Sequence, residues 1–132
     1  MREILFRGKR ISNGEWVYGG IVTSPHPNYN HPMVYAICSN MMDIFVDQDS
    51  IGQYTGLTDK NGTKIFEGDI VAIPGSKMQG LPAEIRYNLN GATFEISRVG
   101  YSHITLWDTK EWCEVIGNIH DNPELLEVED GN

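Results

Sequence analysis

The chain has 132 residues, a formal net charge of −8 and 40% hydrophobic residues, which suits one ordinary domain or two small ones. Its two cysteines, Cys38 and Cys113, lie far apart among apolar neighbours, so we interpret them as core residues of a protein in a reducing compartment. No apolar run of signal-peptide length follows the basic start, and prolines interrupt the uncharged stretch from residue 16 to 42. Secretion and membrane insertion are therefore not expected.

Short apolar runs separated by glycine, proline and asparagine predict an all-β protein. Asn13-Gly14 predicts a tight hairpin, because this pair adopts the positive φ angles of such turns. Residues 24–32 are rich in proline, histidine and asparagine and are predicted to form a loop. The strands predicted in this half are residues 4–6, 15–23, 33–37 and 44–46.

Residues 53–71 follow and are predicted to be a structural joint between two small β subdomains, at about residues 1–58 and 66–132. Asn61-Gly62 predicts a second hairpin within this joint. The turn residues predicted along the chain are Asn13, Gly14, Gly56, Asn61, Gly62, Gly68 and Asp69.

The second half has further strand patterns and a different ending. Asn90-Gly91 predicts a third hairpin, and Asn122-Pro123 predicts the start of one short helix near residues 122–128. The predicted fold is two small, tightly packed barrel-like or bent-sheet subdomains, the second SH3-like. The strands predicted here are residues 70–73, 83–87, 92–97, 104–107 and 113–116.

Three sequence blocks resemble one known family. They are FRGKR with GEWVYG (residues 6–19), QYTGLTDKNGTKIFEGDIV (53–71) and EVIGNIHDNPELLE (114–127). The chain resembles the YopX family of phage and prophage proteins over nearly its whole length. The resemblance implies a mostly β fold and a place in a phage or prophage genome, hence the cytoplasm of a bacterial host. It brings no catalytic residues.

Metal-site patterns are incomplete. Zinc sites usually contain closely spaced ligand pairs, which the candidate ligands His26, His31 and Cys38 do not form. Asp59, Asn61 and Thr63 resemble the start of a calcium loop, but Lys64 replaces the glycine at position six and Ile70 the glutamate at position twelve. No metal or other cofactor is therefore expected.

Catalytic patterns are also weak. A nucleophile beside a histidine and a carboxylate would have to come from the set His103, His120, Asp108, Asp121 and Cys113. The sequence has neither a G-x-S-x-G elbow nor a phosphate-binding loop. A small hydrolase with a histidine and carboxylate site therefore stays an alternative, and the sequence favours a protein that is not an enzyme.

The charge distribution favours a binding role. Residues 1–66 hold six bases and six acids, whereas residues 67–132 hold four bases and twelve acids. A basic start and an acidic end could meet between copies, head to tail, so the preferred function is a non-catalytic protein-binding or self-assembling module. An alternative is nucleic-acid binding through the basic cluster, which comprises Arg2, Arg7, Lys9 and Arg10.

Aromatic residues outside the three blocks are the candidates for a protein contact surface. Most aromatic side chains of a small β protein are needed in its core. At least one of these three is expected to be exposed in a contact surface: Tyr29, Tyr101 and Trp107.

Overall fold

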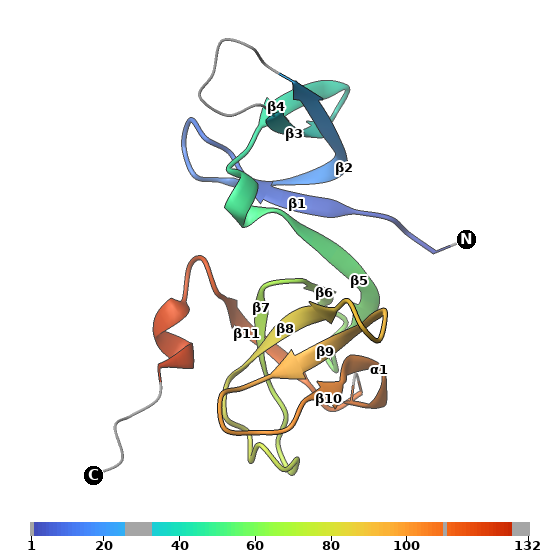
Figure 1. Ribbon diagram of the computed structural model, residues 1–132, viewed down its shortest axis with the longest axis vertical. Coiled ribbons are helices and arrows are strands. Elements are labelled where there is room, and N and C mark those ends of the chain that lie inside the picture. Colours follow the sequence, from blue (N-terminus) through green and yellow to red (C-terminus); the bar gives the residue numbers. More distant parts are fainter. Residues whose placement is uncertain (1, 26–32, 110, 128–132) are drawn as a thin grey trace. The chain divides into compact units, whose positions relative to one another are not determined.

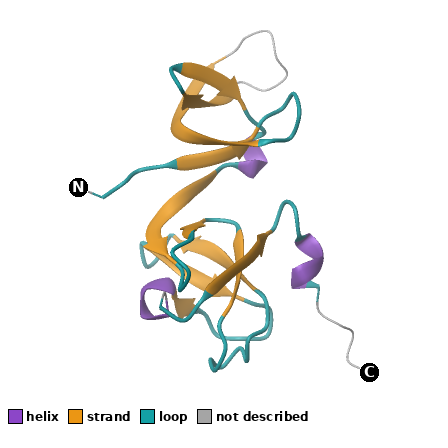
Figure 2. Ribbon diagram, turned by 180° about the vertical axis from the view of Figure 1, so that it is seen from behind, coloured by secondary structure: helices purple, strands orange, loops and turns teal. Residues whose placement is uncertain are grey.

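The structure is a computed structural model that describes residues 2–25, 33–109 and 111–127 (Figure 1). The chain divides into two compact units, Met1–Tyr54 and Thr55–Asn132, called unit 1 and unit 2 below. The described residues are mostly β-strand and form two antiparallel sheets, which Figure 2 shows by secondary structure. The all-β prediction is therefore confirmed.

Unit 1 is an antiparallel arrangement in which neighbouring strands are mostly consecutive in sequence. Its strand order is β4-β3-β2-β1-β5, and β5 continues into unit 2, where β6 is its neighbour. A turn of 3-10 helix, η1 (Gln48–Ser50), precedes β5. The strands are β1 (Phe6–Lys9), β2 (Trp16–Pro25), β3 (Met33–Ser39), β4 (Met42–Phe45) and β5 (Gly52–Thr58).

The hairpin between β1 and β2 lies where Asn13-Gly14 predicts it, but it is not tight. Lys9 faces Trp16, so residues 10–15 form the loop, and Gly14 alone of the pair has a positive φ, of 73°. The first strand also begins later than predicted. It begins at Phe6 because this residue pairs with Gly19 of β2 and with Gln53 of β5.

The turn between β3 and β4 was not predicted, because it contains no glycine. Ser39 pairs with Met42, and the two residues between them, Asn40 and Met41, have φ angles of 51° and 65°. Asparagine adopts this left-handed conformation more easily than methionine does. Of these two residues, only Asn40 is of a type that predicts a turn.

Close approach of two strands explains one glycine of unit 1. A Cβ added at Gly19 would overlap the backbone carbonyl oxygen of Cys38 on the neighbouring strand β3. At the adjacent Gly20 a Cβ would meet nothing within 4 Å. Gly19 is thus required by packing, whereas Gly20 is not.

Unit 2 contains a sheet with the strand order β10-β9-β8-β7-β11. A one-turn helix, α1 (Leu106–Thr109), separates β10 from β11, and a 3-10 turn, η2 (Pro123–Leu126), follows β11. The strands of unit 2 are β6 (Lys64–Phe66), β7 (Asp69–Ala72), β8 (Ala83–Asn88), β9 (Thr93–Ser97), β10 (Ile104–Thr105) and β11 (Glu114–Asn118).

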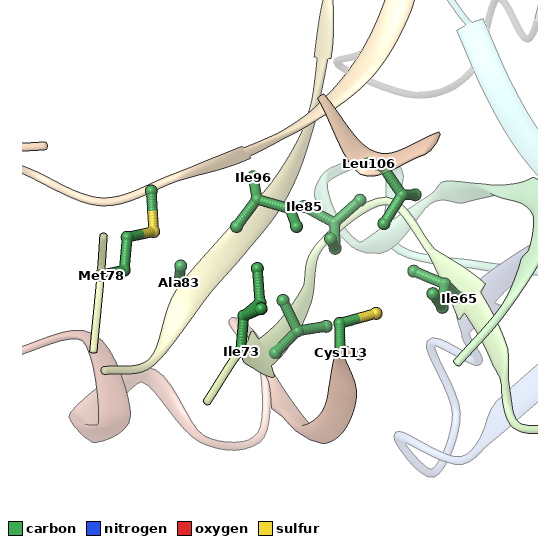
Figure 3. Close-up of a cluster of buried hydrophobic side chains, with 9 residues drawn as sticks. Ile65, Ile73, Met78, Ala83, Ile85, Ile96, Leu106 and Cys113 are labelled. Carbon is green, nitrogen blue, oxygen red and sulfur yellow. The ribbon is translucent and has the colours of Figure 1, made fainter. Parts of the chain in front are cut away.

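The core of unit 2 is drawn in Figure 3. Inward-facing residues of the sheet strands meet there, as the alternation of side chains along a strand requires. Residues in the connections between the strands, including Met78, Leu106 and Cys113, close the cluster. The buried members are Ile65, Val71, Ile73, Met78, Ala83, Ile85, Ile96, Leu106 and Cys113.

Two elements of unit 2 differ in detail from their predicted form. The strand predicted at residues 104–107 ends at Thr105, because Leu106 and Thr109 are both buried and three residues apart, a helical spacing. The predicted C-terminal helix is present as η2, with Pro123 at its start. Figure 1 shows this turn after β11.

Candidate functional site

The most exposed tryptophans of the described chain lie on one loop of unit 2, whose described residues 106–109 and 111–113 we call the tryptophan loop. Trp107 is 62% exposed and Trp112 is 60% exposed. Leu106 and Cys113, at the two ends of the loop, are fully buried in the core. Both indoles are therefore displayed on a segment that is fixed to the core at its two ends.

Hydrogen bonds stabilise the backbone inside the loop. The Thr109 carbonyl accepts from the N–H groups of Trp112, at 2.9 Å, and Cys113, at 3.0 Å. The Thr109 hydroxyl in turn donates to the Leu106 carbonyl at 3.4 Å. Lys110 lies outside the described residues. The described residues of the loop are thus joined to one another by hydrogen bonds.

The three aromatic candidates have different outcomes. Trp107 is exposed as stated, Tyr101 is 36% exposed in the connection between β9 and β10, and Tyr29 lies outside the described residues. Trp112 was not among the candidates. The signal that could have identified it is its position directly before Cys113, whose side chain points into the core.

The basic cluster is divided by the fold of unit 1. Arg2 and Arg10 are exposed, but Arg7 is only 7% exposed. Its guanidinium carbon lies 4.7 Å from the centre of the Trp16 ring, and the Lys9 ammonium lies 5.5 Å from the same ring. Two of the four cations are therefore engaged in cation–π contacts with Trp16, which have a structural role.

Asp59 is the centre of a hydrogen-bond network in unit 2. Its Oδ1 accepts from the backbone N–H groups of Asn61, at 2.8 Å, and Thr63, at 2.9 Å. Its Oδ2 accepts from the N–H of Val115 at 2.9 Å. The turn predicted at Asn61-Gly62 is thus closed by an Asx-type interaction and joined to β11.

The surroundings of Asp59 favour its ionised form. Burial raises the pKa of its carboxyl, but the backbone hydrogen bonds from Val115, Thr63 and Asn61, with the charge of Lys60, outweigh this and lower the pKa below its ordinary value of 3.8. The carboxylate therefore remains charged although it is 6% exposed. Its role is structural, and calcium is not needed to explain it.

Gly68 and Asp69 form a second group of hydrogen bonds in unit 2. Asp69 Oδ2 accepts from the N–H of Phe66 at 2.7 Å. Gly68, whose φ is 87°, donates its N–H to the Ile85 carbonyl, and its own carbonyl accepts from Ile119 at 2.8 Å. Gly56, another predicted turn residue, also has a positive φ, but it lies within β5. Residues 59–69 are therefore connected to β8 and β11 of unit 2 through hydrogen bonds of Gly68 and Asp59.

His103 lies next to a carboxylate that is outside the set predicted for a hydrolase. His103 Nδ1 lies 3.6 Å from Glu95 Oε1, and not beside Asp108, which is exposed on α1. The Asp121 carboxylate accepts from the Asn118 side chain at 3.0 Å. The His120 backbone N–H also bonds to Asn118. The contacts of Asn118 arrange the turn that follows β11, and the Glu95 carboxylate lies next to the His103 imidazole.

Cys113 is unsuited to nucleophilic catalysis. Its side chain is fully buried, and burial together with the charge of Asp59 raises the pKa of its thiol to about 11. The thiolate is the reactive form, so this cysteine is inert in the folded protein. The prediction that both cysteines are core residues is wrong for Cys38, which is exposed on β3.

We expect the thiol reagent DTNB to distinguish these cysteines at mildly alkaline pH. The native protein should release one equivalent of thionitrobenzoate rapidly from Cys38 and a second only after denaturation, because Cys113 is buried and protonated. In the control variant Cys38→Ser, the rapid equivalent should disappear. Rapid labelling of native Cys38→Ser would contradict the placement of Cys113.

Two features are absent from the described part of the chain. No group of three or more histidine, cysteine, aspartate or glutamate side chains there is arranged to hold a metal ion. Among the described helices, none has the length and apolar character to cross a membrane.

Comparisons with known proteins agree with the sequence blocks. The family model described as YopX protein matches residues 5–127. A similar solved structure is that of protein EF1440 from Enterococcus faecalis, which is 26% identical, has a TM-score of 0.58, and aligns over 96% of this chain and all of that one. No curated protein matches the chain. The family model spans nearly the whole chain, which therefore belongs to the YopX family.

Proposed function

We propose that this chain is a non-catalytic accessory protein of a phage or prophage that acts in the host cytoplasm by binding another protein through the tryptophan loop. The observation that carries this proposal is the exposure of Trp107 and Trp112, 62% and 60%, on a segment fixed by Leu106 and Cys113. The resemblance of the sequence blocks to YopX proteins supports the phage or prophage assignment.

Exposed tryptophans on an ordered loop are favourable for protein binding. A tryptophan buries a large area and has few rotatable bonds, and tryptophan is enriched among residues that dominate binding energy. Because the loop is bonded internally through Thr109, little conformational entropy would be lost on binding.

Charge indicates the chemistry of the partner. Asp108 and Glu111 are exposed on the loop, and the whole chain has a formal charge of −8. A phosphate backbone would be repelled by these carboxylates. A protein surface with arginine or lysine side chains would instead meet both the carboxylates and the faces of the indoles.

The finer fold proposal concerns unit 2, which we infer to be an SH3-like barrel. Its support is the strand order β10-β9-β8-β7-β11 with the single-turn helix α1 before the last strand, an arrangement typical of such barrels. SH3-like folds often bind peptides through aromatic side chains on loops, although the fold alone does not determine function.

The test is capture of the partner from lysogenic or infected cells with wild-type protein as bait, followed by calorimetric titration of the purified partner. The double variant Trp107→Ala/Trp112→Ala should weaken binding at least about thirtyfold, as expected when two hot-spot residues are removed. The matched control is Val99→Ala, at a site that is also apolar and 83% exposed but outside the loop. Equal binding by the wild type and the double variant would reject the proposal.

The same capture experiment also tests the alternative that the protein binds a second copy of itself. If the captured protein is a second copy of this chain, sedimentation should show a mass that increases with concentration and decreases in the double variant. A salt series would separate this contact from a head-to-tail contact between the basic start and the acidic end, which salt should weaken more strongly.

A further inference from the structure

Strand β11 is the last strand of its sheet, with β7 as its paired neighbour. An edge strand presents backbone N–H and C=O groups on its outer side, and these groups are a template for pairing with a strand of another chain. The opposite edge of the sheet is β10, which has only two residues. In the described part of this sheet, β11 is therefore the edge that offers the longer template.

The first half of the outer side of β11 is occupied by residues 59 and 60. The Asp59 carboxylate accepts the Val115 N–H at 2.9 Å, and the Lys60 N–H donates to the Cys113 carbonyl at 3.0 Å. Residues 113 and 115 are alternate positions, as expected for groups that point to the same side of a strand. The Lys60 ammonium also lies 3.6 Å from Glu114 Oε2.

The second half is occupied by Asn122. Its Oδ1 accepts the Asn118 N–H at 3.2 Å, and its own N–H donates to the Asn118 carbonyl at 2.8 Å. A Cβ at Gly117 would lie 2.6 Å from Asn122 Oδ1, so a glycine is needed for the asparagine to reach the strand. Between the two caps, a register shift between Val115 and Gly117 interrupts the ladder with β7.

We propose that Asp59 and Asn122 close the outer edge of β11 against pairing with β11 of a second copy of this chain. Their side chains occupy the backbone groups that an added strand would use, and the register shift adds the local twist by which native proteins protect edges. Ile116, which is 38% exposed on this strand, and Trp112, which is 60% exposed two residues before the strand begins, supply apolar surface that would favour such pairing if the caps were absent.

This proposal is independent of the partner bound by the tryptophan loop. It requires only that any other molecule contact the β11 edge through side chains, because the backbone groups of this edge are already hydrogen-bonded within the chain. The acceptor atoms come from two segments, one on each side of β11 in sequence, so one cap can be removed while the other remains.

The test compares Asn122→Ala with Asn122→Asp, which retains an acceptor oxygen, and with Asn88→Ala as a matched control. Asn88 also accepts backbone N–H groups, those of Asn90 and Gly91, but it lies on β8, between β7 and β9. Sedimentation across a concentration series should show Asn122→Ala half-associated at a concentration about tenfold lower than wild type, because each newly available backbone hydrogen bond contributes about that factor. The two other variants should match wild type.

Hydrogen exchange of the wild-type protein provides a second readout that needs no variant. The amides of Val115 and Asn118 should be protected although they lie on the outer side of an edge strand. Exchange of both at the rate of an unstructured peptide would overturn the proposal. The proposal would also be overturned if Asn122→Ala were folded by circular dichroism and had the wild-type mass at every concentration. Association of Asn88→Ala to the same extent as Asn122→Ala would overturn it as well.

Discussion

Replacing Asp59 with alanine is expected to lower the free energy of unfolding by about 3 kcal/mol, because a buried acceptor of several backbone hydrogen bonds is lost. The N–H groups of Asn61, Thr63 and Val115 would lose their partner together. Urea unfolding followed by circular dichroism measures this change. The matched control is Asp47→Ala, which removes an exposed carboxylate that accepts one backbone N–H, from Asp49.

Acid should produce a related effect in the wild-type protein. The pKa of Asp59 is lower in the folded state than its ordinary value of 3.8, so the unfolded chain binds this proton more readily. The stability that the carboxylate contributes is therefore fully present above pH 3.8 and is lost as the pH falls through the folded-state pKa. Asp59→Ala should lack this part of the acid dependence, and equal acid dependence in both proteins would contradict the assignment.

Replacing Gly19 with alanine is expected to destabilise unit 1 by about 3 kcal/mol, because a well-packed strand pair must move apart to admit a methyl group. The new Cβ would overlap the carbonyl oxygen of Cys38, which is a backbone atom and cannot turn away as a side chain could. Urea unfolding would measure the loss, and NMR spectra would show whether the affected amides belong to β2 and β3.

The neighbouring Gly20 provides the control for this variant. Its Cβ would meet nothing within 4 Å, so Gly20→Ala should change the free energy of unfolding by no more than about 0.5 kcal/mol. If Gly19→Ala and Gly20→Ala unfolded at the same urea concentration, the close approach of β2 and β3 at Cys38 would be wrong.

Local sequence patterns predicted the features that depend on nearby residues. The strands on either side of Asn13-Gly14, Asn61-Gly62 and Asn90-Gly91 pair as hairpins, although the first hairpin is not the tight one predicted. Hairpins are predictable because alternating apolar residues and turn-forming pairs act over a few positions. Which turn residue adopts a positive φ angle was less predictable. In the last hairpin the positive φ belongs to Ala92 and not to Gly91, while the Asn88 side chain bonds to the turn.

The candidate site was only partly predictable. Trp107 and Trp112 both lie outside the family blocks and are both exposed, but only Trp107 is among the predicted contact residues. The sequence predicts one basic cluster, yet Arg7 is buried against Trp16. Exposure depends on which residues the rest of the chain covers, and sequence spacing does not contain that information.

The sequence by itself determined the all-β class, the YopX family and the positions of the main turns, since each rests on short-range patterns or on blocks of contiguous residues. Tertiary structure alone decided that Asp59 meets β11, whereas Asn122 reaches β11 through a local turn. Asp59 lies 56 positions from Val115, and only the pairing of distant strands brings such groups within hydrogen-bond distance. Burial likewise made Cys113 an inert core thiol and left two tryptophans of the same loop exposed.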